Sequence, residues 1–499
     1  MKICKILHFS ATNVIYNSFY MKFLFRCSLL LVLFAGTQLS AIAQNAVEEW
    51  DWSKCLQHTI DNNLQLKQAE INIQLGEATL KQQKLNYSPS VNASTNYNLR
   101  VGNNFNFFTS AYTQELVHFQ DYGLNVSQPV FDGLIIANNI KKSKLDVEAL
   151  QFDQQTLQNN IVLQMLAAFL NIMNAKEQEQ QALQQQQITR EQYERIKTMI
   201  EAGAAAEQAT LDIEAQLASE ELTLAQINNQ LALAYLQLKI ILQLPVDKDI
   251  TVKIPALPES WSVAPLSDVM TVYNNALQSQ PQVKSSQLKT KSAEKAIDIA
   301  KGNYYPSLNL IANASTFYSS QNKITRQQLT GNTTAIGIVE GTFQRVLIPE
   351  TQTTQSKNPY GKQLNQNFSY AVGLGLTIPI YNKYQVKTAV KQSRLQHQLA
   401  IINEQQTNLE LYNNIQQAYL KASASLESYK AAEKNYRTAQ KSYDYATERL
   451  QAGSIQQLDV NLAKSNLLIA LSRLSQSKYE YLFNSKVLDF YEGKPITLE

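Results

Sequence analysis

The feature that most constrains this chain is the absence of Gly and Pro from two very long stretches. Neither residue occurs from Leu134 to Ala202 or from Ile380 to Ala452, and shorter runs without them cover residues 204–244 and 454–492. These stretches are rich in Gln, Ala, Leu, Glu and Lys, which favour helix. At a rise of 1.5 Å per residue, each of the two longest helices would extend on the order of 100 Å. An ordinary globular domain has no room for such helices.

Apolar residues recur along both long stretches at the spacing of a coiled coil. They lie at Ile140, Val147, Leu150, Leu157, Ile161, Ala168, Ile172 and Ala175 in the first stretch, and at Leu395, Leu399, Ile402, Leu409, Tyr412, Tyr419 and Leu426 in the second. Steps of three, four and seven place these residues on one helix face. A compact helical bundle would make the same contacts, but the length of the helices favours an extended coiled coil.

The chain repeats itself. Gln65, Lys84, Tyr87 and Pro89 recur 217 positions later as Gln282, Lys301, Tyr304 and Pro306, and Pro129, Tyr193 and Gly203 recur 250 positions later as Pro379, Tyr443 and Gly453. We therefore predict a first structural repeat over 44–244, a Pro-rich linker over 245–265, a second repeat over 266–492 and a short tail over 493–499.

Each half also contains two segments in which apolar and polar residues alternate. We predict strands at about 90–100, 122–130, 307–318 and 368–380, between a helix and the long helix (134–202 or 382–452). Alternation over about ten residues is typical of membrane β-barrel strands, although a half-buried hairpin of a soluble protein has the same pattern. The expected fold class is mainly α, a long coiled-coil α-helical barrel with a small β-barrel contribution.

Four strands cannot close a barrel, because the smallest membrane barrels have about eight. An unclosed sheet edge is not tolerated in lipid. Two copies would supply eight strands, and three copies would supply twelve with room for a channel, so a homotrimer in membrane lipid is favoured. The polar segments 101–121 and 319–366 are expected to be outward-facing loops.

The N-terminus predicts export. After Met21, which we take as the true start, come Lys22, Arg26, the apolar run Ser28–Phe34 and an A-x-A site ending at Ala43, so residues 1–43 are expected to be a signal peptide. The alternative is an N-terminal anchor, but the run is too short to span hydrocarbon. The exported chain would keep only Cys55, which excludes an intrachain disulfide.

The strand-to-helix junctions carry Pro129 and Phe131 in the first half and Pro379 and Tyr381 in the second. Because Pro lacks an N–H, we expect it to end strand pairing, with Asp132 or Asn382 capping the helix that follows. The Gln-rich run 178–187 is interpreted as a solvated helix face rather than a binding site.

No pattern points to an enzyme, a cofactor or a metal. The sequence contains no Gly-rich phosphate loop, zinc motif or nucleophile elbow. Cys55 and His58 could share a helix face, but no third metal ligand follows at fixed spacing. The nearly neutral exported chain gives no reason to expect nucleic-acid binding.

The order of elements in each half resembles the outer membrane efflux proteins, the TolC-like channel-tunnels. The turns Glu201–Leu217 and Gln451–Leu467, each in register with a strand pair, carry the resemblance, which covers the chain from about Val47 to Tyr491. It implies a twelve-stranded trimeric barrel in the outer membrane of a Gram-negative bacterium. A helical cylinder would reach through the periplasm to an adaptor and an inner-membrane pump for efflux or type I secretion. A periplasmic coiled-coil adaptor or scaffold without a barrel is the alternative.

The resemblance also implies a closed periplasmic tip. The residues placed there, where the adaptor would dock, are Gly203, Ala204, Ala205, Gly453, Ser454 and Ile455. Asp459 has the spacing of an aspartate that constricts the pore in this family, while the first half has Ala209 there and Asp212 three residues on. A solvated acid that stabilises the start of a helix is the alternative for Asp459.

Overall fold

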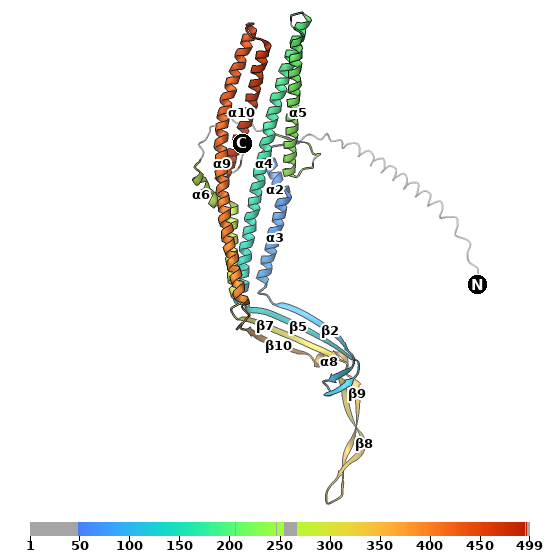
Figure 1. The fold of residues 1–499 in the computed structure, drawn as a ribbon. Coiled ribbons are helices and arrows are strands. Elements are labelled where there is room, and N and C mark those ends of the chain that lie inside the picture. Colours follow the sequence, from blue (N-terminus) through green and yellow to red (C-terminus); the bar gives the residue numbers. More distant parts are fainter. Residues whose placement is uncertain (1–47, 205, 246, 254–266, 495, 497–499) are drawn as a thin grey trace, which may run out of the picture.

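The computed structural model describes residues 48–204, 206–245, 247–253, 267–494 and 496. The expected signal peptide over 1–43, most of the linker over 245–265 and most of the tail over 493–499 lie outside the described residues. A long bundle of helices bends sharply into a narrow sheet, and a hairpin extends beyond the sheet (Figure 1).

Four helices in each half build the bundle. The first half has α2 (Trp52–Asn62), α3 (Leu64–Leu85), α4 (Ile135–Glu201) and α5 (Gln208–Leu242), and the second has α6 (Val269–Ser279), α7 (Pro281–Gly302), α9 (Gln385–Gln451) and α10 (Gln457–Tyr491). Corresponding helices have equal lengths of 11, 22, 67 and 35 residues. In the described part of the chain, no helix combines the length and the apolar character needed to cross a membrane.

An antiparallel four-stranded sheet follows the bundle, with strand order β10-β7-β5-β2. Its strands are β2 (Ser90–Arg100), β5 (Val117–Phe131), β7 (Ser307–Ser319) and β10 (Ser369–Thr377). Each half contributes two strands, and the halves meet where β5 pairs with β7. Because β2 and β10 each have a single neighbour in the described chain, both outer edges of the sheet carry unpaired backbone groups.

The sheet has one apolar and one polar face, since cross-strand partners point to the same side and successive residues to opposite sides. The register places the following residues on the apolar face: Val91, Ala93, Val126, Leu124, Leu308, Leu310, Val372, Leu374 and Leu376. The opposite face carries Asn92, Ser94, Asn125, Gly123, Asn309, Asn313, Gly373 and Gly375. The short helix α8 (Tyr360–Gln366) covers one end of this apolar face, where the Tyr360 hydroxyl lies 2.6 Å from the Tyr122 hydroxyl and the Leu364 carbonyl accepts a hydrogen bond from Thr316 Oγ1. In the described chain, the rest of the face has no helix packed against it.

Two segments expected as loops contain further structure. β3 (Asn103–Asn106) pairs with β4 (Ala111–Gln114), β8 (Lys323–Ile338) pairs with β9 (Arg345–Lys357), and α8 (Tyr360–Gln366) precedes β10. The segments 101–121 and 319–366, which we expect to be outward-facing loops, therefore contain two hairpins and a short helix. Thr and Ile are frequent in β8, and such β-branched residues favour extended backbone even in a polar segment.

The largest buried cluster lies in the middle of the bundle. Met165, Phe169 and Ile172 of α4 pack there with Leu238 of α5 and Leu482 of α10. The short strands β1 (Glu48–Trp50) and β6 (Ile250–Val252) pair in parallel beside it. The apolar spacing predicted for the long helices has two outcomes. Five of the eight residues named in α4 are buried, whereas Leu395, Leu399, Ile402 and Leu409 of α9 are 51–59% exposed.

Candidate functional site: the helical tips, the inter-hairpin cleft and the strand-to-helix junctions

The helices α4 and α5 form one helical hairpin, and α9 and α10 form a second one. The tips of the two helical hairpins have the same backbone geometry. Gly203 and Gly453 follow α4 and α9, and both have φ of +70°, a left-handed conformation that Gly adopts at helix ends. Gly203 N–H donates to the Ile200 carbonyl over 2.8 Å, and Gly453 N–H donates to the Leu450 carbonyl over 2.9 Å. A Cβ added at either glycine would meet no atom within 4 Å. The left-handed backbone, and not crowding, therefore accounts for Gly at both tips.

The other residues predicted at the tip differ in position. Ala204 and Ser454 are exposed, and Ile455 is partly exposed in a cleft of about 750 Å³ that Arg449 and Asp459 also line. Ala205 lies outside the described residues.

Asp459 is exposed at the third position of α10 and forms a capping box. Its Oδ2 accepts a hydrogen bond from Gln456 N–H over 3.2 Å, while the Gln456 side chain accepts one from the Asp459 backbone. A carboxylate at this place also stabilises the helix dipole. Asp212 is exposed on α5 and is not among the residues that line the Asp459 cleft, so one protomer does not bring the two acids together there.

A buried polar cluster connects the two helical hairpins, with members on α4, α5 and α10. Glu220 Oε1 of α5 accepts hydrogen bonds from Gln185 Nε2 (3.1 Å), Thr189 Oγ1 (2.9 Å) and Gln216 Nε2 (2.9 Å). Its second oxygen, Oε2, is buried without a hydrogen-bond partner in the described chain. Lys464 of α10 donates to Thr189 Oγ1 over 3.1 Å, and burial lowers the pKa of its ammonium. Sequence reasoning missed this cluster, because its members are far apart in the chain.

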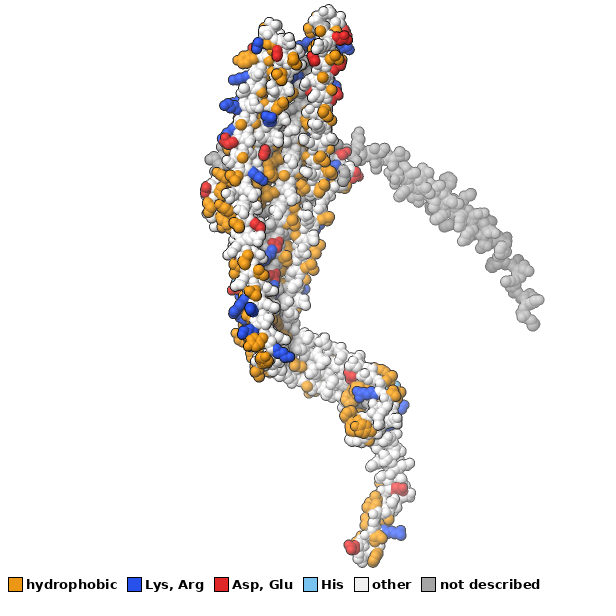
Figure 2. Space-filling view, in the orientation of Figure 1, with side chains coloured by type: hydrophobic (Ala, Val, Ile, Leu, Met, Phe, Trp, Pro, Cys, Tyr) orange, Lys and Arg blue, Asp and Glu red, His pale blue; other side chains and the backbone are white. Residues whose placement is uncertain are grey.

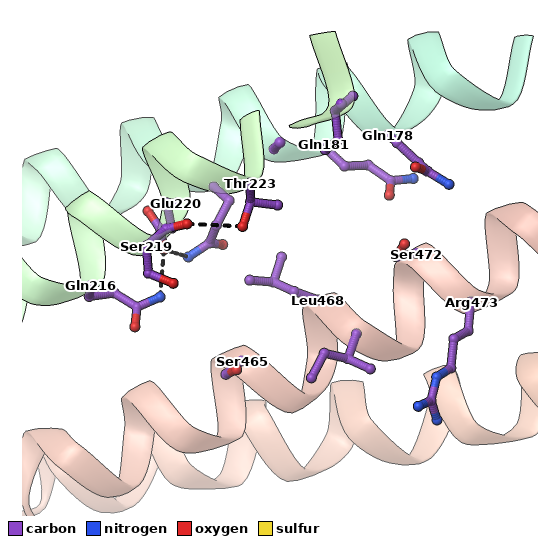
Figure 3. Close-up of a pocket in the computed structure, with 14 residues that line it drawn as sticks. Gln178, Gln181, Gln216, Ser219, Glu220, Thr223, Ser465, Leu468, Ser472 and Arg473 are labelled. Atoms are coloured by element: carbon purple, nitrogen blue, oxygen red, sulfur yellow. Dashed lines mark hydrogen bonds between the residues drawn. The ribbon is translucent and has the colours of Figure 1, made fainter. Parts of the chain in front are cut away.

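The cluster lies beside a cleft of about 400 Å³ between the two hairpins (Figure 3). Gln178 and Gln181 of α4 line one side, and Ser465, Leu468 and Arg473 of α10 line the other. The interpretation of the run 178–187 as a solvated helix face was wrong at Gln185, which is buried. A buried amide keeps its hydrogen bonds here because the Glu220 carboxylate accepts one.

At the first junction, pairing does not end at Pro129. Pro129 stays in register with Asn309, and after a bulge Phe131 pairs with Leu308. The expectation that Pro129 ends the ladder was therefore wrong, since the bulge accommodates the missing N–H. At the second junction, β10 ends at Thr377, two residues before Pro379, and Tyr381 is exposed. The Asp132 carboxylate accepts a hydrogen bond from Ile136 N–H of α4 over 2.6 Å, as its capping role requires.

The start of α4 passes very close to the end of α7. A Cβ on Gly133 would lie 2.3 Å from the carbonyl oxygen of Gly302, and a Cβ on Gly302 would lie 2.4 Å from Ile135 Cγ1. Gly133 also has φ of +69°. The junction of the two halves therefore needs both glycines, a requirement that no local motif at Gly302 signals.

The described chain offers little for catalysis or metal binding. It holds no group of three or more His, Cys, Asp or Glu side chains that could bind a metal ion. Cys55 is buried in α2, and burial raises the pKa of its thiol to about 12, which suppresses the reactive thiolate. His58 contacts the Trp50 ring edge to face at 5.0 Å between centroids.

Comparison with known proteins places this geometry in context. The family described as outer membrane efflux protein matches residues 55–242 and 272–493. The alkaline protease secretion protein AprF of Pseudomonas aeruginosa is 21% identical over 375 residues, which cover 74% of this chain and 69% of AprF.

Solved structures have the same fold. The outer membrane protein VceC of Vibrio cholerae superposes with a TM-score of 0.69 at 13% identity, covering 89% of this chain and 97% of VceC. The outer membrane channel CmeC of Campylobacter jejuni superposes with a TM-score of 0.68 at 19% identity, covering 89% of this chain and 85% of CmeC.

Proposed function

The chain belongs to the outer membrane efflux protein family, and from this premise we propose that three copies form one continuous exit duct. The protein is an outer-membrane channel of a tripartite efflux or type I secretion system and extends into the periplasm; it is not an enzyme. In the trimer, twelve strands close a barrel in the membrane, and the long helices form a tunnel below it. The two halves with equal helix lengths are repeats of one unit.

The two-faced sheet with two unpaired edges carries this proposal. In the described part of one protomer, the edge strands β2 and β10 leave backbone groups without partners, which lipid does not tolerate. Pairing β10 of one copy with β2 of the next satisfies both edges around a ring. The apolar face then contacts lipid, and the Asn- and Gly-rich face lines the lumen.

The exposed stripe of α9 supports the same assembly. The helices pack side by side in the order α3, α4, α7 and α9, so α9 forms one edge of this row. The exposed stripe lies on α9 and consists of Leu395, Leu399, Ile402 and Leu409. A neighbouring α3 would bury them as a coiled-coil seam. A periplasmic adaptor without membrane strands, the alternative from the sequence, gives the two-faced sheet no role.

Proteins of this family work with a periplasmic adaptor and an inner-membrane pump. We place the adaptor contact at the hairpin tips, where Gly203, Ala204, Gly453 and Ser454 present small side chains on exposed turns. The pump supplies the energy, and the channel itself provides a passive path.

The test is a purification from outer membranes in mild detergent, followed by mass determination and reconstitution into planar bilayers. The proposal expects a trimer that retains its β signal in circular dichroism and conducts ions. A monodisperse monomer with native β structure, or a trimer without conductance, contradicts it. A pull-down of the assembled complex then identifies the adaptor and the pump.

A further inference from the structure

A cluster of cations lies where the second half passes from sheet to helix. Lys387, Lys391 and Arg394 of α9, together with Lys301 of α7, line a cleft of about 530 Å³. Blue side chains gather there at the foot of the bundle, beside hydrophobic ones (Figure 2). No Asp or Glu occurs in the chain between Glu350 and Glu404, so α9 brings no local counter-charge.

Ion pairing inside the protomer leaves most of this charge uncompensated. Asp298 pairs with Lys295 at 3.0 Å and with Lys301 at 3.6 Å. In the described chain, Lys387, Lys391 and Arg394 form no ion pair with a carboxylate. Lys387 instead lies over the Tyr384 ring, 4.9 Å from its centroid. Lys387 also lies in the first turn of α9, where the helix dipole repels positive charge. The arrangement therefore favours an anion from outside the chain.

The basic cleft faces away from the polar side of α9. Gln385, Gln392, Gln396 and Asn403 follow at helical spacing on the side opposite Lys387 and Arg394. Like the Asn- and Gly-rich face of the sheet, this side of α9 is polar and uncharged. Arg394 and Tyr412 are 18 residues apart, which is five helical turns, so both lie on the same side of α9. The Tyr412 ring contacts the Tyr273 ring of α6, with 5.2 Å between the ring centroids. Figure 1 shows α6 beside α9, on the side away from α4, so the basic cleft lies on the α6 side of α9.

Apolar and aromatic side chains adjoin the cations directly. A second cleft of about 270 Å³ shares Tyr304 and Lys387 with the first and is also lined by Ile380 and Tyr381. Ile380 is 95% exposed and follows the apolar face of β10. Tyr side chains are typical of the membrane–water interface, and Lys and Arg reach from there to headgroups. A small inorganic anion would neutralise the cations but would leave Ile380 and Tyr381 uncovered.

We propose that this basic cleft binds the phosphate headgroup of an anionic phospholipid from the periplasmic leaflet, with an acyl chain against Ile380 and the apolar face of β10. Lys387, Lys391 and Arg394 bind the phosphate, and Tyr304 and Tyr384 border the headgroup. The inference rests on the proposed membrane position of the sheet. It assigns to this junction a lipid contact that fixes the height of the tunnel relative to the membrane.

The test compares three proteins in detergent by native mass spectrometry, with phosphatidylglycerol or phosphatidylcholine added. They are the wild type, Lys387→Gln with Lys391→Gln, and the matched control Lys421→Gln with Lys434→Gln, which removes two exposed cations farther along α9. We expect wild type and control to prefer phosphatidylglycerol. The junction variant should lose about tenfold in phosphatidylglycerol affinity and keep its phosphatidylcholine affinity. If the junction variant does not fold, Arg394→Gln alone takes its place.

Three results would overturn the lipid site: equal phosphatidylglycerol binding by all three proteins, equal loss in the control variant, or a preference that inorganic phosphate abolishes. The last result would assign the cleft to a free anion. Conductance in planar bilayers is measured on the same preparations. Wild-type conductance with no lipid preference refutes only this inference, whereas absent conductance refutes the channel itself.

Discussion

Lys464 Nζ of α10 donates a hydrogen bond to Thr189 Oγ1 of α4 over 3.1 Å, and so joins the two hairpins across 275 positions of sequence. Thr189 in turn donates to Glu220 Oε1 at 2.9 Å. A buried cation and a buried carboxylate therefore share one hydroxyl. Leaving either charge alone in this position is costly, because a buried ion needs a partner.

We predict that Lys464→Met and Glu220→Gln each lower the stability of the protein by about 1–3 kcal/mol. Each single variant leaves one buried charge without its opposite, whereas the double variant removes both. The double variant should therefore unfold at a higher temperature than the sum of the single effects implies. The loss of helical circular dichroism on heating measures this, with the exposed Lys421→Met as the control. Strictly additive effects would show that Lys464 and Glu220 do not interact.

The same lysine predicts a pH dependence. Burial lowers the pKa of Lys464 below its ordinary value of 10.5. Between the folded pKa and 10.5, the unfolded chain holds a proton that the folded protein has released, so this group makes stability rise with pH. Burial raises the pKa of Tyr479, which acts in the opposite direction in alkali. The unfolding temperature of wild type minus that of Lys464→Met isolates the lysine and should increase with pH in this window. A constant difference would refute the shift.

One tip glycine and one junction glycine give a matched pair of substitutions. Gly203→Ala places a Cβ in open space at φ of +70°, so we expect a cost of about 1–2 kcal/mol from the left-handed backbone alone. Gly133→Ala has the same backbone conformation and in addition a Cβ 2.3 Å from the Gly302 carbonyl, so we expect a loss on the order of 4 kcal/mol. The yield of folded protein and the unfolding temperature measure the loss of stability in each variant. Equal losses would mean that the junction can relax.

Much of this fold follows from local sequence rules. Breaker-free runs predict α4 and α9 to within three residues at each end, because Gly or Pro flanks each run on both sides. The alternation of apolar and polar residues predicts β2, because successive side chains of a strand point to opposite faces of the sheet. The rules fail where contacts are distant. Nothing near Gly302 indicates that Gly133 lies against it, and nothing near Gln185 indicates that Glu220 makes it a buried residue. The apolar stripe that begins at Leu395 is exposed, because the neighbouring protomer that we propose to cover it is not part of a single chain.

At the tip, Ala204→Trp should impair efflux while leaving export and assembly intact. Ala204 is exposed in the turn after Gly203, so a bulky ring there changes the surface that we propose for adaptor docking and disturbs no core. Susceptibility to exported drugs, or secretion of the exported protein, measures the effect in cells. Ala431→Trp, which alters an exposed site on α9 about 20 residues from the tip, is the control. Normal efflux by both variants would place the adaptor contact elsewhere.

Asp459 tests whether a helix cap also serves as a pore gate. In a trimer with converging tips, three Asp459 carboxylates would face one another around the axis and attract cations. Asp459→Asn removes this charge but keeps an oxygen that can accept the Gln456 N–H, whereas Asp459→Ala removes both. We therefore expect both variants to lower cation selectivity and block by divalent cations in planar bilayers. Only Asp459→Ala should also lose about 1 kcal/mol of stability from the missing cap. Wild-type selectivity in Asp459→Asn would show that the carboxylate only caps α10, and Asp212 would be the next gate candidate.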